Sequence, residues 1–80
     1  MRVEYISDWE EGLVESHAEL DVVTGEVGSI EEAGYGDDYE FLNREYIIVN
    51  GVELEVGRDE NDLYCVDVNL LKDVLVWLQH

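Results

Sequence analysis

Residues 13–27 read LVESHAELDVVTGEV, and apolar and charged side chains alternate along most of this stretch. Since successive side chains of a β-strand point to opposite faces, the alternation predicts a strand with one apolar side and one charged side. Thr24-Gly25 offers a tight turn, so the strand is expected to fold back as a hairpin. The apolar side would carry Val14, Ser16, Ala18, Leu20 and Val22, and the charged side Glu15, His17, Glu19 and Asp21.

The strand that returns from this turn has two possible endings. Pairing Val22 with Val27 is favourable because both side chains are apolar. Continued along the strand, however, that register places Ile30 opposite Glu19, on the charged side. Either a bulge at Gly28 corrects the register or the returning strand ends early.

A second hairpin is predicted around Asn50-Gly51, because this dipeptide separates two β-rich runs, EYIIV at 45–49 and VELEV at 52–56. The first run is apolar on both sides, which indicates a strand inside the sheet. The second run alternates, so its three apolar residues are expected to face the core: Val52, Leu54 and Val56.

Shorter elements complete the expected fold. Residues 2–6 and 63–66 predict short strands, residues 7–12 a polar turn and residues 31–43 a loop. Near the C-terminus, apolar residues recur at helical spacing after a cap at Asp67 or Asn69. We therefore predict a single α+β domain, 1–80, with an antiparallel sheet of five or six strands and one C-terminal helix packed on one face. The apolar stripe of that helix comprises Leu71, Val74, Leu75 and Leu78, widened by Leu70 and Trp77.

The charge of the chain is its most unusual property. Twenty-one acidic residues against four basic ones give a formal net charge of −17 over 80 residues. Small domains usually stay soluble with a charge of magnitude about 2–8. Nucleic acids and anionic membranes would repel such a chain, whereas basic protein surfaces would attract it. The expected partner is thus a basic protein surface, with the protein itself a monomer or a weak homodimer.

Acidic residues are concentrated in the first half of the chain. Between residues 3 and 40 there are thirteen of them and no lysine or arginine. A solvated sheet face would normally mix both signs, so the excess favours partner binding by charge over mere solubility. Trp9 is predicted to be a core residue, with an exposed anchor at Trp9 or Tyr35 as the alternative. The predicted partner-binding residues are Glu15, Glu19, Asp21, Glu26, Glu31, Glu32, Asp37, Asp38, Glu40, Trp9 and Tyr35.

Catalysis and metal binding find little support in the sequence. His17 lies in the acidic row, and Cys65 lies in an apolar run where a buried thiol is common. Residues 59–62, DEND, match only the start of a calcium-binding loop, since leucine and tyrosine occupy the later ligand and glycine positions. We therefore expect no enzyme activity and no cofactor. A weak divalent-cation module remains an alternative, as does a structural or regulatory module whose acidity serves solubility.

The location expected from the sequence is the cytoplasm. The single cysteine, Cys65, cannot form an internal disulfide, which suits a reducing compartment. The first residues, MRVEYISDWEE, lack the apolar region of a signal peptide, and no apolar run is long enough to span a membrane.

In size, charge and layout the chain resembles the small inhibitor proteins encoded by phages, among them DNA mimics and anti-CRISPR proteins. The features that carry the resemblance are the length of 80 residues, the acidic row on the first long strand and the Asn50-Gly51 hairpin. The resemblance implies an inhibitor that occupies the nucleic-acid-binding groove of a host defence complex, acting in the host cytoplasm. It includes no specific motif, so the acidic residues named above come from the strand pattern alone.

Overall fold

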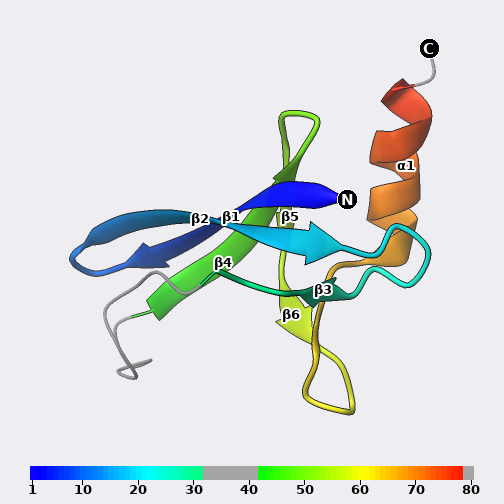
Figure 1. The fold of residues 1–80 in the computed structure, drawn as a ribbon. Coiled ribbons are helices and arrows are strands. Elements are labelled where there is room, and N and C mark those ends of the chain that lie inside the picture. Colours follow the sequence, from blue (N-terminus) through cyan, green and yellow to red (C-terminus); the bar gives the residue numbers. More distant parts are fainter. Residues whose placement is uncertain (32–41, 79–80) are drawn as a thin grey trace.

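The computed structural model describes residues 1–31 and 42–78 of the chain, and of residues 77 and 78 the backbone alone. As predicted, the fold is α+β: an antiparallel sheet and a C-terminal helix, joined by a second small sheet (Figure 1). The elements are β1 (Arg2–Trp9), β2 (Gly12–Leu20), β3 (Val27–Gly28), β4 (Leu42–Val49), β5 (Val52–Glu55), β6 (Gly57–Arg58), β7 (Tyr64–Cys65) and α1 (Val68–Leu78).

The main sheet contains five antiparallel strands in the order β3-β2-β1-β4-β5. β1 lies at its centre and pairs along its whole length with β2. β4 lies between β1 and β5, which confirms that the apolar run at 45–49 is inside the sheet. Its most deeply buried side chains are Ile47 and Val49, at 0% and 1% exposure.

The alternation of residues 13–20 is confirmed, because Ser16, Ala18 and Leu20 are buried while the residues between them are exposed. The predicted extension to Val22 is wrong: β2 ends at Leu20, and Val22 is 39% exposed. The register differs accordingly, since Val27 lies opposite Leu20 instead of Val22.

The returning strand β3 ends early, at Gly28, which was one of the two predicted outcomes. Ser29 then adopts a positive φ of 49°, which turns the chain out of the strand direction. Ile30 is half-buried and packs against the core, so it does not lie on the charged side of the sheet.

The second hairpin forms where Asn50-Gly51 predicts it. Asn50 and Gly51 have φ values of 53° and 79°, as a tight turn with two left-handed residues requires, and Val49 pairs with Val52 on either side. Leu54 faces the core as expected, but Val52 is 44% exposed because it stands at the outer end of an edge strand.

β1 is longer than the sequence suggested. Residues 7–9 were predicted to start a turn, yet they extend the strand to Trp9, and the turn is confined to residues 10 and 11. Asp8 pairs with Arg44 and Trp9 with Leu42, so one extra residue, Asn43, bulges out of β4. Of the loop predicted at 31–43, residues 42 and 43 belong to β4, and residues 32–41 lie outside the described part of the chain.

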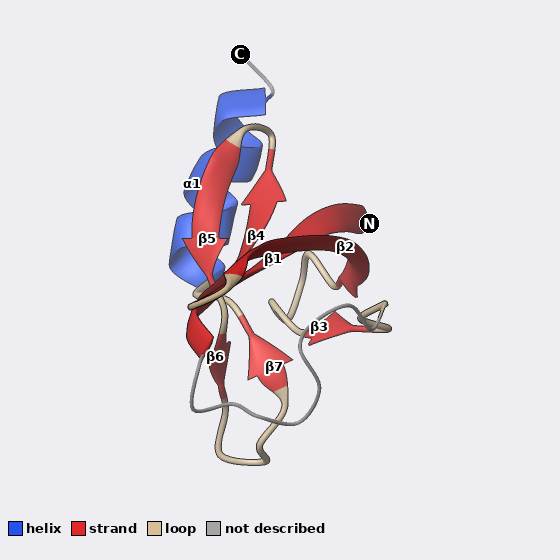
Figure 2. Cartoon of the chain, turned by 90° about the vertical axis from the view of Figure 1, so that its left-hand side faces the viewer, coloured by secondary structure: helices blue, strands red, loops and turns tan. Residues whose placement is uncertain are grey.

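Helix α1 begins where Asp67 caps it. One Asp67 carboxylate oxygen, Oδ1, accepts hydrogen bonds from the backbone N–H groups of Asn69, at 2.8 Å, and Leu70, at 3.4 Å. Leu71 and Val74 enter the same core cluster as the inner side chains of β1, β2, β4 and β5. Leu70 is 53% exposed and does not widen the apolar stripe as predicted. The helix thus stands beside the β4–β5 hairpin and covers one face of the main sheet (Figure 2).

A separate two-stranded sheet follows the main one. β6 pairs with β7 through Gly57 opposite Cys65 and Arg58 opposite Tyr64. The predicted strand at 63–66 is therefore reduced to Tyr64 and Cys65. Val66 after it is buried in the core cluster. Its N–H donates a 2.9 Å hydrogen bond to the carbonyl oxygen of Gly25, which connects the turn between β2 and β3 to the segment before α1.

Candidate binding face

The main sheet has two unlike faces. The inner face packs on the helix, while the outer face carries most of the charged side chains of the strands. Residues directly opposite each other in an antiparallel pair share a face, so the register identifies the members of the outer face. They are Arg2, Glu4, Ile6, Asp8, Leu13, Glu15, His17, Glu19, Arg44, Tyr46, Ile48, Glu53 and Glu55.

Two of the predicted binding residues lie on the outer face as expected. Glu15 and Glu19 are exposed residues of β2, on either side of His17. Glu19 is partly neutralised, because one of its carboxylate oxygens lies 3.4 Å from the N-terminal amino group of Met1. Glu15 takes part in no ion pair within residues 1–31 and 42–78.

Asp21 does not continue the acidic row, contrary to the prediction. Its Oδ1 atom accepts hydrogen bonds from the backbone N–H groups of Val23 and Thr24, at 2.9 and 3.2 Å. These hydrogen bonds hold the pKa of Asp21 below its ordinary value, because they stabilise the carboxylate. The backbone of Asp21 also accepts the N–H of Gly25 at 2.8 Å. Asp21 therefore stabilises the turn between β2 and β3.

The other predicted binding residues have four different outcomes. Glu26 is exposed. Its backbone forms an isolated antiparallel β-bridge with the backbone of Cys65, between the main sheet and the second sheet. Glu31 is exposed and contacts Arg2 and His17. Trp9 is only 6% exposed, which agrees with the core interpretation of this residue. The remaining ones fall in the stretch that the structure does not describe: Glu32, Tyr35, Asp37, Asp38 and Glu40.

One arginine, Arg44, pairs with both acids of the second acidic row, on β5. The Arg44 Nη2 atom lies 3.2 Å from a carboxylate oxygen of Glu53 and 2.8 Å from one of Glu55. The same guanidinium group lies over the ring of Tyr46, with 4.3 Å between its central carbon and the ring centroid. Arg44 therefore offsets one of the two negative charges on the β4–β5 side of the outer face.

Uncompensated negative charge gathers at β1, β2 and the turn between them. Glu4, Glu10, Glu11 and Glu15 are exposed, and Asp8 is half-buried. None of these five acids forms an ion pair with any other described residue. Only Glu15 was among the predicted binding residues. The other four belong to the acidic stretch at residues 3–40, but the sequence did not show that the basic side chains would pair with other acids.

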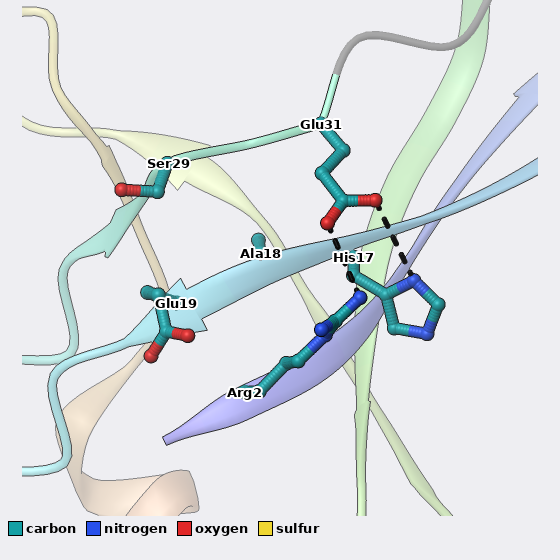
Figure 3. A pocket seen from close by; sticks show the side chains of 6 residues that line it. All are labelled: Arg2, His17, Ala18, Glu19, Ser29 and Glu31. Atoms are coloured by element: carbon teal, nitrogen blue, oxygen red, sulfur yellow. Dashed lines mark hydrogen bonds and ion pairs between the residues drawn. The ribbon is translucent and has the colours of Figure 1, made fainter.

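A hollow of about 140 Å³ opens beside β2, where the segment after β3 passes the sheet (Figure 3). Glu31 spans it: one carboxylate oxygen lies 3.2 Å from Nη2 of Arg2, and the other lies 3.8 Å from Nδ1 of His17. The backbone N–H of Glu31 donates a 2.9 Å hydrogen bond to the carbonyl oxygen of His17. The lining is completed by Ala18, Glu19 and Ser29.

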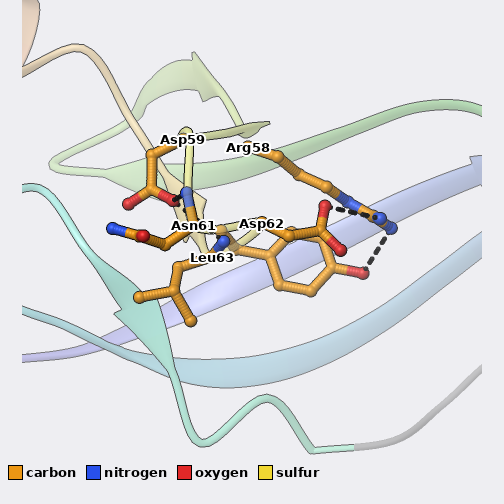
Figure 4. Close-up of polar contacts among 6 residues, drawn as sticks. Arg58, Asp59, Asn61, Asp62 and Leu63 are labelled. Carbon is orange, nitrogen blue, oxygen red and sulfur yellow. Dashed lines mark hydrogen bonds and ion pairs between the residues drawn. The ribbon is translucent and has the colours of Figure 1, made fainter.

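In the polar turn at residues 59–63, Asp59 and Asp62 interact with groups of the turn itself or next to it (Figure 4). Asp59 Oδ1 accepts the N–H groups of Asn61, at 2.8 Å, and Leu63, at 3.0 Å. Asp62 pairs with Arg58 at 3.3 Å, and the Tyr64 hydroxyl accepts a hydrogen bond from Arg58 at 3.0 Å. Across residues 1–31 and 42–78, no group of three or more histidine, cysteine or acidic side chains is arranged to hold a metal ion.

One carboxyl group lies on the inner face. Glu45 is half-buried and accepts a hydrogen bond from the hydroxyl of Tyr5. Burial raises the pKa of Glu45, while the nearby Arg58 guanidinium opposes that rise. The hydrogen bond joins Tyr5 of β1 to Glu45 of β4, so we assign this pair a role in stability.

The comparisons with known proteins add no relative. Within the described residues, no helix combines the length and the apolar character needed to cross a membrane. No family model matches the chain, and neither a curated protein nor a solved structure resembles it closely enough to count as a match.

Proposed function

We propose that this protein is a non-enzymatic inhibitor that binds the basic nucleic-acid-binding surface of a defence complex and excludes DNA or RNA from it. The observation that carries the proposal is the uncompensated acidity of β1, β2 and their turn. Uncompensated carboxylates attract a basic surface without first breaking an ion pair. A CRISPR effector complex, with its positively charged channel for nucleic acid, has the required chemistry.

Rigidity of the acids supports the proposal. Glu4 stands on β1 and Glu15 on β2, and these two strands pair with each other along the whole length of β1, with Glu4 opposite His17 and Glu15 opposite Ile6. Diagonal neighbours of this kind are about 7–8 Å apart, and the sheet fixes that spacing. A preorganised row loses less conformational freedom on binding than charges on a flexible tail. Glu10 and Glu11 extend the row around the turn.

The test compares two double variants that change the net charge equally. In the first, Glu4→Lys is combined with Glu15→Lys. In the second, Glu60→Lys is combined with Asp73→Lys, two exposed acids that do not belong to the outer face. Each variant is added to purified DNA- and RNA-binding complexes, CRISPR effectors among them, and nucleic-acid binding is measured by mobility shift at low and high salt.

We expect inhibition to weaken about tenfold or more in the first variant, because reversal replaces attraction by repulsion at two positions. The second variant should inhibit nearly as well as the natural sequence. Equal losses in both variants would show that only bulk charge matters. If no basic complex is inhibited by the natural sequence, the proposal fails, and acidity that serves solubility becomes the better account.

A further inference from the structure

We propose that Glu31, Arg2 and His17 form a proton-responsive clasp, which holds residues 29–31 against the main sheet more tightly when His17 is protonated. Glu31 belongs to the segment after β3, Arg2 to β1 and His17 to β2, so the three side chains join three parts of the chain. They meet at the hollow shown in Figure 3. The clasp is independent of the inhibitor function proposed above.

The two cationic partners of Glu31 differ in chemical type, because a guanidinium group keeps its charge whereas imidazole is the side-chain group whose charge generally changes between about pH 5 and 8. Arg2, whose Nη2 atom lies 3.2 Å from Glu31, stays charged under all physiological conditions. The Nδ1 atom of His17 lies 3.8 Å from the other carboxylate oxygen, which is too long for a hydrogen bond. A protonated imidazole carries a positive charge and an N–H at both ring nitrogens, so it can close on the carboxylate.

Charged groups face His17 from every neighbouring element. Glu4 lies directly opposite on β1, and Arg2 is the next outer-face residue of that strand. Glu15 and Glu19 flank His17 on β2, and Glu31 faces it from the segment after β3. The four carboxylates attract a positive imidazole and Arg2 repels it. Glu31 is the carboxylate that tethers a separate segment, and for this reason protonation is coupled to docking.

Docking of the segment has a direct reporter. The backbone N–H of Glu31 donates to the carbonyl oxygen of His17 at 2.9 Å, so this amide is protected from solvent exchange only while the segment is docked. Exposed ion pairs are modest in strength. We therefore expect the protection factor of the Glu31 amide to be about two- to fivefold higher at pH 5.5 than at pH 7.5.

The experiment measures hydrogen exchange by NMR at both pH values, normalised to the intrinsic rate at each pH. The variants are His17→Gln, which cannot take up a proton, and Glu31→Gln, which keeps the backbone hydrogen bond but loses the carboxylate. The N–H of Val66, bonded to Gly25, reports any change in global stability. The expected result is that the pH effect disappears in both variants while Val66 behaves alike in all three proteins.

Two results would overturn the proposal. One is an equal protection factor at both pH values in the natural sequence. The other is a pH effect that persists in His17→Gln, since the proton would then act at another group. Because His17 is exposed on the sheet surface, its replacement leaves the core intact, and Glu31→Gln provides a second check if that variant is perturbed.

Discussion

Gly25 lies where two parts of the fold approach each other closely, and alanine at this position should destabilise the protein strongly. A Cβ atom added to Gly25 would lie 2.7 Å from the carbonyl oxygen of Val66 and 3.0 Å from a side-chain carbon of Val68. The first of these contacts is with backbone, which cannot rotate away. The residue also has a φ of +80°, a conformation that alanine adopts only with strain.

Gly51 provides a matched control for this effect. Its φ is +79°, yet a Cβ added there would meet nothing within 4 Å. Left-handed strain costs roughly 1–2 kcal/mol, and the reduced freedom of the unfolded chain offsets about 0.4–1 kcal/mol of it. We therefore expect Gly51→Ala to lower the free energy of unfolding by about 1 kcal/mol. Gly25→Ala adds the clash, at roughly 1–3 kcal/mol, and should reach about 2–4 kcal/mol.

The assay is urea and thermal unfolding followed by circular dichroism. For a domain of this size, 1 kcal/mol shifts the melting temperature by about 4–8 °C, so Gly25→Ala should lower it at least twice as far as Gly51→Ala. A domain this small has only a few kcal/mol of stability, and Gly25→Ala can leave it partly unfolded at room temperature. Equal losses of stability in the two variants would refute the close approach of Gly25, in the turn between β2 and β3, to Val66.

Two further predictions concern polar groups. Since burial raises the pKa of Glu45, the folded protein binds this proton more readily than the unfolded chain, and the natural sequence should gain stability relative to Glu45→Gln as pH falls from about 7 towards about 4. Denaturant unfolding of both proteins across this range measures the difference, and a constant difference would contradict the assignment. Replacing Asp67 by alanine should cost about 1 kcal/mol through loss of the helix cap. Asp67→Asn, which keeps an acceptor, should retain most of that stability in the same melts, and an equal loss would argue against capping.

Local chemistry explains why much of the fold could be predicted. Asn50-Gly51 sets its turn through its own backbone preferences, and the alternation at 13–20 follows from the two-residue period of a strand. The end of β2 was missed because the Asp21 side chain competes for backbone N–H groups that the strand pattern assigns elsewhere. The side chain wins these N–H groups only if the chain can turn after Asp21, and the alternation of apolar and charged residues does not reveal whether it can.

The candidate site was harder to predict because it depends on contacts distant in sequence. The pattern placed Glu15 and Glu19 on the charged side, but it could not tell that a terminal amine neutralises one and leaves the other alone. Arg2 and Glu31 are 29 residues apart in the chain. Ion pairing of this kind follows from the register of the whole sheet, and it decides which acids remain available to a partner.

The outermost strands of the main sheet have a consequence for concentrated solutions of the protein. An edge strand offers unpaired backbone groups to which a second chain can add. Here β5 forms one edge and carries Glu53 and Glu55 among its four residues, while β3, at the other edge, is two residues long and pairs only with the end of β2. Copies that each carry a charge of −17 also repel one another. Strand-by-strand growth into aggregates is therefore disfavoured at the β5 edge by its charge, and the repulsion between copies is strongest at low salt, where it reaches furthest.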